Sequence, residues 1–566
     1  MIKKLFAVIC ALCIIAMMTA SCLAEEADYT AEEKTVPLYI ASADHRQDLK
    51  VYYINGGSIP YISAGDVGML IEKTYNSEPQ AYPFAGLEYK TDGDHAVYTR
   101  SGEAYTMDFD FTKDTIIFAD YDAFYRLEGT SLVDMVWPSA GTVRLYQKSD
   151  LALDRYGKTL TIDLAAYGID LVQTKDGYYV PLQTVSDLLI SYYGGYMLFN
   201  GEAVVLGTPD EELSGILASG TNQWNEEFAR FNYSELCCAL DYQYGLKDIH
   251  GIESFDRLFE ETGLKAEFLS DDETKADQAL YKLISWYLGD LHSSYNGVSY
   301  MTDMERMREM SAVRGLAAEK RNSFLADLSE ARNAAYPDGI PAYEEVGNTA
   351  YITFDVFKDP DSSIDYYAAP TEADNSMGDT IRLMQYACSR ILREGSPVEN
   401  VVLDLSLNAG GSTLAAEYVL AAFLRDADFS TKNMMTGAMT DAVYTVDTNL
   451  DGLFDEKDTL EGKGLRLYCL ESPVSFSCGN LTPCVFKASQ RVTLLGRTSG
   501  GGSCSIYSLT TASGARFDIS GFRRFSVMKN GSFYDVDTGA DPDYLVADPA
   551  KYYNREALTE FINGLF

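Results

Sequence analysis

The chain has 566 residues, of which 46% are hydrophobic, and a formal net charge of −39 from 84 acidic and 45 basic side chains. This apolar content excludes a disordered protein, and the length allows more than one domain. The strongly acidic balance argues against nucleic acid or an anionic membrane surface as a partner.

The first 24 residues are typical of a secretory signal peptide. Lys3 and Lys4 form a positive start, and the apolar stretch that follows at 5–18 is too short to span a membrane. The small residues before Cys22 resemble a bacterial lipoprotein processing site, in which this cysteine carries the lipid; ordinary cleavage after Ala24 is the alternative. We therefore expect an extracellular or cell-surface protein whose membrane contact, if it has one, is a lipid anchor at Cys22.

Residues 30–210 contain short alternating runs and turns, which predict an α+β domain. Two segments, at 52–70 and 176–189, repeat one pattern of a turn, a short strand and an amphipathic helix. The pattern resembles the stalk-like repeat found beside the catalytic part of copper amine oxidases and on bacterial surface proteins. The resemblance implies a stalk-like N-terminal domain, with an unrelated α+β domain as the alternative.

The second part of the chain, residues 215–566, alternates helical patterns with buried strands. This alternation predicts an α/β fold with a mainly parallel sheet covered on both faces. The charged stretch at 301–335 predicts a helical subdomain. Strands are expected at 349–354, 401–405, 465–470 and 492–495, and helices at 272–289, 379–394 and 414–424.

Seven cysteines lie beyond the leader, scattered along the chain. An odd, scattered set is a poor disulfide framework, and none of them forms a paired cluster typical of zinc. We therefore expect buried thiols that behave as small hydrophobic side chains. Nothing in the sequence predicts an organic cofactor.

A histidine and a serine far apart in the sequence form a candidate nucleophilic pair. Among four histidines, His292 alone has a setting typical of catalysis, in the run Asp-Leu-His-Ser after a helix. Ser477 follows an apolar strand and precedes a helical pattern. A serine hydroxyl is a weak nucleophile until a base takes its proton, which His292 would do. Taken alone, Ser477 would be interpreted as a helix N-cap.

A glycine turn, Gly410-Gly411, follows the strand expected at 401–405 and opens a helix. Glycines let the backbone approach a ligand closely, and the N–H groups at a helix start are unsatisfied. Such groups can hold a developing oxyanion, and the backbone next to Ser477, at Cys478, would give a second donor. A plain strand–helix turn is the alternative.

The order of these segments resembles that of the carboxy-terminal processing peptidases, also called tail-specific proteases, and of the tricorn protease core. The resemblance implies a Clp/crotonase-like peptidase core. It also implies that Ser477 is the nucleophile, His292 the base and Asp537, or else Asp535, the orienting carboxylate. The match covers about 235–550. Its runs are D-x-H-S at 290–293, D-L-x-x-N-x-G-G at 404–411, a serine-led run at 477–480, T-x-G-G at 498–501 and G-x-x-P-D at 539–543.

Three departures from the family pattern stand out. Ser406 replaces an arginine, and Asn480 replaces a glutamate. The lysine nearest to Ser477 is Lys487, which lies at the wrong spacing for a Ser–Lys dyad. The last departure argues against a Ser–Lys dyad and leaves His292 as the base.

From the leader and the resemblance together, we expect an extracellular serine peptidase that hydrolyses peptide bonds of peptide or protein substrates. The alternatives are an inactive binding module of the same fold, as in retinoid-binding relatives, and a structural surface lipoprotein.

Residues 447–458 fit the calcium-loop template, with oxygen ligands at loop positions 1, 3, 5, 9 and 12 and glycine at position 6. Position 7 gives a backbone carbonyl, and position 12 is aspartate where glutamate is usual. A structural calcium site is predicted, and a solvated acidic loop is the alternative. The predicted ligands are Asp447, Asn449, Asp451, Leu453, Asp455 and Asp458.

Overall fold

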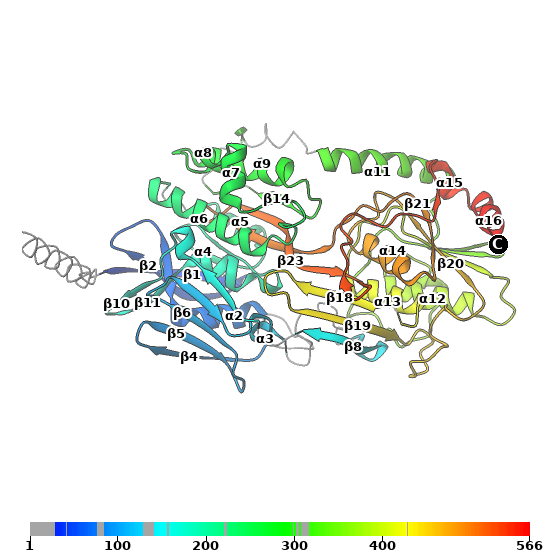
Figure 1. Cartoon of the computed structure of the whole chain (residues 1–566), viewed down its shortest axis with the longest axis horizontal. Helices are drawn as coiled ribbons and strands as arrows, with labels where there is room; N and C mark the ends of the chain where they lie inside the picture. Colours follow the sequence, from blue (N-terminus) through cyan, green and yellow to red (C-terminus); the bar gives the residue numbers. More distant parts are fainter. Residues whose placement is uncertain are drawn as a thin grey trace, which may run out of the picture.

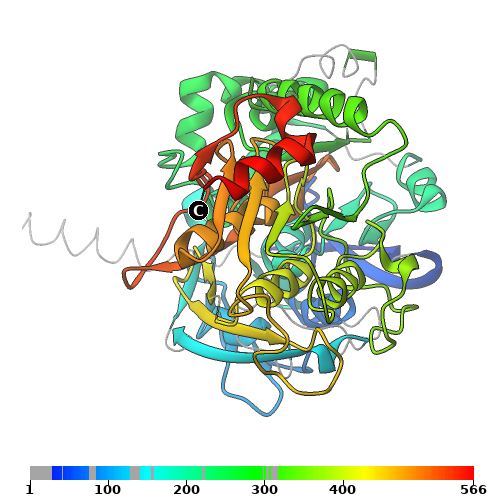
Figure 2. The same ribbon diagram turned by 90° about the vertical axis from the view of Figure 1, so that its right-hand side faces the viewer.

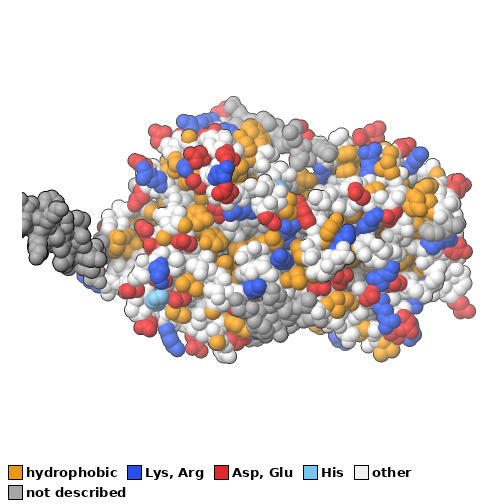
Figure 3. Space-filling model, in the orientation of Figure 1, with side chains coloured by type: hydrophobic (Ala, Val, Ile, Leu, Met, Phe, Trp, Pro, Cys, Tyr) orange, Lys and Arg blue, Asp and Glu red, His pale blue; other side chains and the backbone are white. Residues whose placement is uncertain are grey.

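The computed structural model contains two lobes, with the N-terminal sheets at one end and the C-terminus at the other (Figures 1 and 2). On the face drawn in Figure 3, acidic and basic side chains are interspersed. The signal peptide and Cys22 lie outside the described residues. The structure describes residues 29–40, 42–75, 84–127, 141–154, 158–219, 224–297, 299–300, 305–306, 316–426 and 428–565.

The N-terminal lobe contains a seven-stranded and a five-stranded sheet, of orders β10-β11-β3-β2-β1-β13-β12 and β4-β5-β6-β7-β9. The two predicted repeats are confirmed as strand–helix units. Strand β3 leads into α2, β11 leads into α4 and a π-helical turn, and the two strands pair antiparallel with Val180 opposite Ile62. The bounds are β1 Ala31–Ile40, β2 Ser42–Ile54, β3 Pro60–Ser63, α2 Val67–Tyr75, β4 Leu87–Asp92, β5 His95–Arg100, β6 Thr106–Asp110, β7 Thr115–Phe118, α3 Tyr121–Tyr125, β9 Leu160–Asp163, β10 Val172–Thr174, β11 Gly177–Pro181, α4 Leu182–Thr184, β12 Met197–Phe199, β13 Val204–Leu206 and α5 Glu211–Leu217.

The C-terminal lobe is built on a sheet of order β15-β16-β17-β20-β21-β26, in which every pair after the first is parallel. All four predicted strands and the three predicted helices are found, with bounds that differ by a few residues. The strands are β15 Tyr343–Val346, β16 Thr349–Thr353, β17 Asn400–Asp404, β20 Arg466–Glu471, β21 Thr493–Gly496 and β26 Tyr544–Leu545. The helices are α11 Leu316–Ala335, α12 Thr380–Ile391, α13 Thr413–Phe423, α14 Cys478–Ser489, α15 Pro549–Tyr553 and α16 Arg555–Asn563.

Both faces of this sheet are covered, as predicted. Val401 and Leu403 of β17 belong to a core shared with α12, α13 and α14. Val402 between them belongs to a second core shared with α11, α15 and α16. Since side chains alternate along a strand, a run that is apolar at every position must be buried on both sides. Parts of the predicted helical stretch at 301–335 lie outside the described residues, and its described end is α11.

A third sheet, of order β14-β23-β18-β19-β8 with β22 beside β23, crosses the middle of the molecule (Figure 1). Its strand β8 comes from the N-terminal part of the chain, so the expected boundary near residue 210 does not separate the sheets. The helices beside this sheet precede the loop that contains His292. The bounds are β8 Tyr146–Asp154, α6 Glu226–Gln243, α7 Phe255–Thr262, α8 Leu264–Phe268, α9 Glu273–Lys282, β14 Ser294–Gly297, β18 Asp428–Asn433, β19 Met439–Val446, β22 Cys504–Thr510 and β23 Arg516–Ser526. Two further short strands are β24 Met528–Lys529 and β25 Ser532–Phe533.

The seven cysteines beyond the leader are buried free thiols, as predicted. Burial raises their pKa; that of the Cys478 thiol, for example, rises to about 12. Among the described helices, none has the length and apolar character needed to cross a membrane.

Buried carboxyl groups predict that this fold loses stability as pH rises. Burial raises the pKa of Asp187 to about 7 and that of Glu235 on α6 to about 8, although both accept hydrogen bonds. A folded-state pKa above the unfolded value means that the folded chain binds the extra proton. The stabilisation is therefore fully present below about pH 4 and is lost as pH rises to about 8.

We expect Glu235→Gln to reduce the loss of unfolding free energy between pH 5 and pH 8 by an amount on the order of 1–3 kcal/mol. Urea unfolding at both pH values measures this. Glu226→Gln is the matched control, because Glu226 is an exposed acid on the same helix. An identical pH dependence in wild type and Glu235→Gln would show that Glu235 is already ionised in the fold.

Candidate active site

Ser477 lies between β20 and α14 in a strained backbone conformation, with φ 57° and ψ −125°. A residue with a Cβ rarely adopts a positive φ, and such strain is concentrated at functional sites. Its N–H donates to the carbonyl of Gly501 at 2.9 Å, and its own carbonyl accepts from Leu481 N–H at 2.8 Å. These bonds on both sides hold the residue in place.

The hydroxyl of Ser477 does not cap α14, because it accepts no hydrogen bond from the first turn of that helix. An N-cap serine uses its oxygen for this purpose. The interpretation of Ser477 as an ordinary helix cap is therefore wrong. Its hydroxyl is left for another role.

Glycines let the neighbouring turns approach Ser477 closely. A Cβ on Gly410 would lie 2.5 Å from the Ser477 Cβ, and a Cβ on Gly502 would lie 3.0 Å from the Ser477 nitrogen. Asn408 fixes the first of these turns: its carbonyl accepts from Phe476 N–H at 3.0 Å and its Oδ1 from Gly410 N–H at 2.8 Å. The glycine pattern at 408–411 thus serves the packing of one turn against another.

Two of the three predicted oxyanion residues have free N–H groups. Gly411 and Cys478 line the same cavity as Ser477, and in the described part of the chain neither of their N–H groups donates a hydrogen bond. The N–H of Gly410 is instead used by the side chain of Asn408. The pair at Gly411 and Cys478 is therefore the better candidate for holding an oxyanion.

His292 lies in the loop between η6 (Leu283–Tyr287) and β14, and its ring is buried. The carboxylate of Asp290 holds this loop, accepting from the backbone N–H of His292 at 3.0 Å and from the Ser293 hydroxyl at 2.7 Å. The imidazole packs edge-on against Phe476, with 4.6 Å between the ring centroids. Burial lowers the pKa of His292, while the charges of Asp290 and Asp537 partly offset this effect. The ring is therefore neutral at neutral pH, as a general base must be.

Ser477 and His292 line one cavity of about 1010 Å³. Within the described part of the chain, no hydrogen bond joins the two side chains, and Nδ1 of His292 has no partner. Catalytic hydrogen bonds often form only when substrate is bound, so the missing bond does not exclude a catalytic role for Ser477 and His292. The structure thus brings together two residues that are far apart in the sequence.

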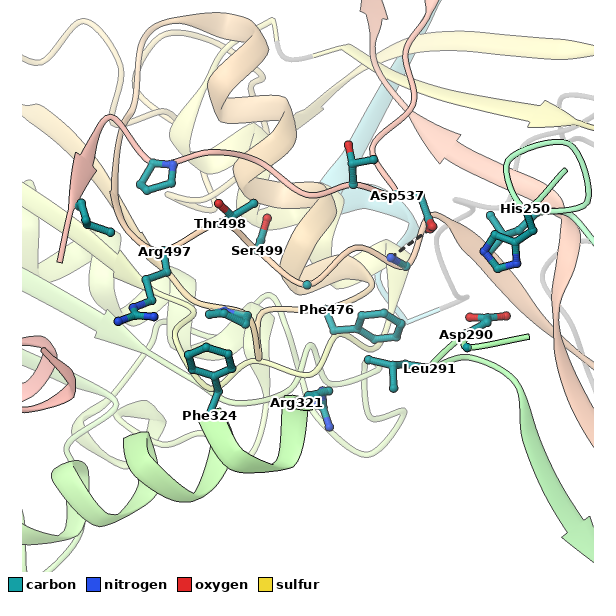
Figure 4. Close-up of a pocket in the computed structure, with 18 of the residues that line it drawn as sticks. His250, Asp290, Leu291, Arg321, Phe324, Phe476, Arg497, Thr498, Ser499 and Asp537 are labelled. Atoms are coloured by element: carbon teal, nitrogen blue, oxygen red, sulfur yellow. Dashed lines mark hydrogen bonds between the residues drawn. The ribbon is translucent and has the colours of Figure 1, made fainter. Parts of the chain in front are cut away.

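Asp537 lies in the neighbouring cavity of about 750 Å³ (Figure 4). Its Oδ1 accepts from the N–H groups of Gly502 and Ser503 at 3.2 and 3.0 Å, and from the Ser503 hydroxyl at 3.1 Å. It therefore braces the turn whose Gly501 carbonyl holds Ser477. The alternative carboxylate, Asp535, is paired with Arg524 at 2.6 Å.

The departures from the family pattern have structural explanations. Asn480 is buried behind the cavity, donating to the Val536 carbonyl at 2.9 Å and accepting from the Ser499 hydroxyl at 2.7 Å. Lys487 pairs with Asp543 and lines neither cavity.

Ser406 stands where the family has an arginine, and a guanidinium from α16 reaches the same strand end. Arg555 pairs with the buried Asp404 at 2.6 Å, and the Ser406 hydroxyl contacts that of Tyr553 at 3.0 Å. The buried charge of Asp404 is thus compensated by a residue far along the chain.

The acidic loop at 447–458 holds its first and last residues close together. Asp447 Oδ1 is buried without a hydrogen-bond partner, and burial raises the pKa of Asp458 with help from the charge of Asp447. Lys457 Nζ lies 3.7 Å from Asp451 and 3.5 Å from Asp455. Across the described residues, no three His, Cys, Asp or Glu side chains converge as a metal site. The unpartnered Asp447 oxygen is suited to bind a cation. The other predicted ligands lie too far apart in this structure to bind the same cation.

The sequence did not reveal the roles of Asn408, Asp290 and Phe476. Asp290 stands in the D-x-H-S run, so its spacing from His292 was a usable signal. Nothing in the sequence indicates that Phe476 packs on the imidazole.

Residues 348–546 match the family described as peptidase family S41. None of the curated proteins compared matches the chain.

Similar solved structures include a candidate peptidase from Parabacteroides merdae, with 16% identity, a TM-score of 0.40, and coverage of 60% of this chain and 96% of that one. Mature CPAF in complex with lactacystin has 13% identity, a TM-score of 0.35, and coverage of 60% and 99%. The photosystem II D1 C-terminal processing protease has 17% identity, a TM-score of 0.25, and coverage of 36% and 42%. The match at 348–546 includes Ser477 and the glycine turn. Residues 348–546 are thus similar to peptidase family S41, the broader family to which the motifs of this segment pointed.

Proposed function

We propose that this protein is an extracellular serine peptidase in which Ser477 is the nucleophile and His292 the base. The observation that carries the proposal is a strained serine that caps no helix, in one cavity with a buried, neutral imidazole. The substrate class, peptides or proteins, follows from the chemistry of the S41 family.

The proposed reaction is ordinary acyl transfer. The Ser477 oxygen attacks the carbonyl carbon of the scissile bond while an imidazole nitrogen of His292 takes the hydroxyl proton. The N–H groups of Gly411 and Cys478 hold the oxyanion. His292 then gives the proton to the leaving amine, and water hydrolyses the acyl-enzyme by the same route. Asp290 positions the His292 loop, and the charge of Asp537 favours the imidazolium that forms.

We expect Ser477→Ala and His292→Ala each to lower kcat by at least about 10⁴-fold, and the double variant to be hardly worse, because both remove one step. Asp537→Asn should cost the same or less. A fluorophosphonate probe should label wild type but not Ser477→Ala. Lys487→Ala is the control, with unchanged activity expected. Loss of activity in Lys487→Ala, with His292→Ala still active, would falsify the assignment.

The same assay over pH separates a buried base from a free one. Activity should fall in acid as His292 is protonated, with a midpoint below about 6.5, because burial lowers its pKa. In the described structure His292 makes no hydrogen bond to Ser477 or Asp537, which favours a second candidate, an inactive binding module. No cleavage of any peptide, together with no labelling of Ser477, would support that candidate.

We propose further that the loop at 447–458 binds a structural calcium ion through the six residues predicted above. The supporting observation is the unpartnered, buried Oδ1 of Asp447. Binding would have to draw Asp451 and Asp455 away from the Lys457 ammonium, which is consistent with weak affinity.

Calcium at ten times a Kd of about 1 mM should stabilise the fold by about 1.4 kcal/mol relative to a chelator. Thermal unfolding measures this shift. Asp447→Asn should reduce it, whereas Glu456→Gln should keep it, because Glu456 is an acid of the same loop outside the ligand positions. Equal unfolding midpoints with calcium and with chelator would contradict calcium binding and support the alternative, a solvated acidic loop.

We also propose that the mature protein is exported and tethered through a lipid on Cys22. The leader and the small residues before this cysteine motivate the proposal. Intact-mass analysis of the membrane fraction should give a lipid-modified chain that begins at Cys22, and Cys22→Ser should release the protein. An unmodified chain beginning at Glu25 would leave export without a tether.

A further inference from the structure

Arg321, on α11, lies where the two cavities of the candidate site meet. Among the described residues, the cavity of Ser477 and the cavity of Asp537 share four lining residues, and Arg321 is the only charged one of these four. Two of the others, Leu291 and Phe476, directly precede His292 and Ser477 in the chain. Figure 4 shows Arg321 near Leu291 and Phe476, with α11 entering from the same side.

Within the described residues, no acidic group pairs with this guanidinium. In the described part of the chain, Arg321 has no ion pair or hydrogen bond, and its Nε is buried without an acceptor. By contrast, Arg332 on the same helix makes a bidentate pair with Asp355 at 2.7 and 2.8 Å. Burial lowers the pKa of Arg321, and no carboxylate of the described residues offsets this effect. Burying a guanidinium without a partner costs folding free energy. The chain has 84 acidic residues that could have supplied a partner, yet none of the described ones does.

The other charged groups around the cavities already have partners or lie in solvent. Asp290 and Asp537 accept hydrogen bonds from the His292 loop and from the turn at 502–503. The guanidinium of Arg497 donates to the Ala547 carbonyl and lies over the Phe324 ring. Lys358 is exposed. Among the described cations that line the two cavities, Arg321 is therefore the one that is partly buried and has no partner.

We propose that Arg321 binds a carboxylate of the peptide substrate and so selects peptides that carry one near the scissile bond. The inference rests on the proposed peptidase function. A guanidinium binds a carboxylate in a planar, bidentate manner, which fits an acidic side chain or a free C-terminus. The overall acidity of the protein would disfavour acidic peptides, so selection for them requires a local cation such as this one.

Binding to Ser477→Ala tests the inference without requiring catalysis. Fluorescein-labelled peptides are compared as Glu-containing and Gln-containing pairs, each with a free and with an amidated C-terminus. The carboxylate form should bind about 10- to 100-fold more tightly, a range set by hydrogen bonds to charged groups. In Ser477→Ala with Arg321→Gln the preference should disappear, and with Arg321→Lys it should be partly kept. Arg497→Gln, with a guanidinium that is already engaged, is the control and should keep it.

The peptide pairs identify the source of the carboxylate. A preference for Glu over Gln assigns the side chain, and a preference for the free over the amidated end assigns the terminus. Equal binding of all four peptides, or a preference that survives Arg321→Gln, would overturn the inference. Cleavage of peptides without such a preference would leave the proposed peptidase intact. No labelling of Ser477 and no cleavage, with the preference for carboxylate still present, would instead overturn only the peptidase.

Discussion

The site depends on three backbone turns that pack against one another with no room for side-chain atoms between them. Phe476 N–H donates to the Asn408 carbonyl at 3.0 Å, Ser477 N–H to Gly501 at 2.9 Å, and Gly500 N–H to Ser475 at 2.7 Å. The turns follow β17, β20 and β21, whose carboxyl ends meet at one edge of the parallel sheet. Ligand sites of open α/β sheets lie at this edge, because adjacent loops converge there.

Desolvation dominates the electrostatics around the nucleophile. It keeps His292 neutral, and it raises the pKa of the Cys478 thiol. The thiol next to Ser477 is therefore inert although it lines the same cavity. Selectivity between two adjacent nucleophiles arises from the environment of each, since a protonated thiol at neutral pH attacks poorly.

Elements with a strong local signal were predictable from the sequence. The apolar run at 401–403 indicated a strand buried on both faces, and Gly410-Gly411 indicated a tight turn at the start of a helix. The position of His292 beside Phe476 was not predictable, since it depends on the packing of β14 against β23, more than 200 residues apart. The contact of Arg555 with Asp404, 151 residues away in the sequence, is likewise one that no local pattern encodes.

Strand β8 has a consequence for how the molecule can be divided. It pairs antiparallel with β19 from Tyr146 opposite Val446 to Asp154 opposite Met439, and the loop after β19 is tied back to it by a bond from Asp447 N–H to the Leu145 carbonyl. Removal of the chain up to residue 154 would take β8 away from β19 and expose the β19 backbone as an open edge, a template for self-association. The segment at 348–546 that matches family S41 is thus only part of the sheet to which β19 belongs, since that sheet also includes β8.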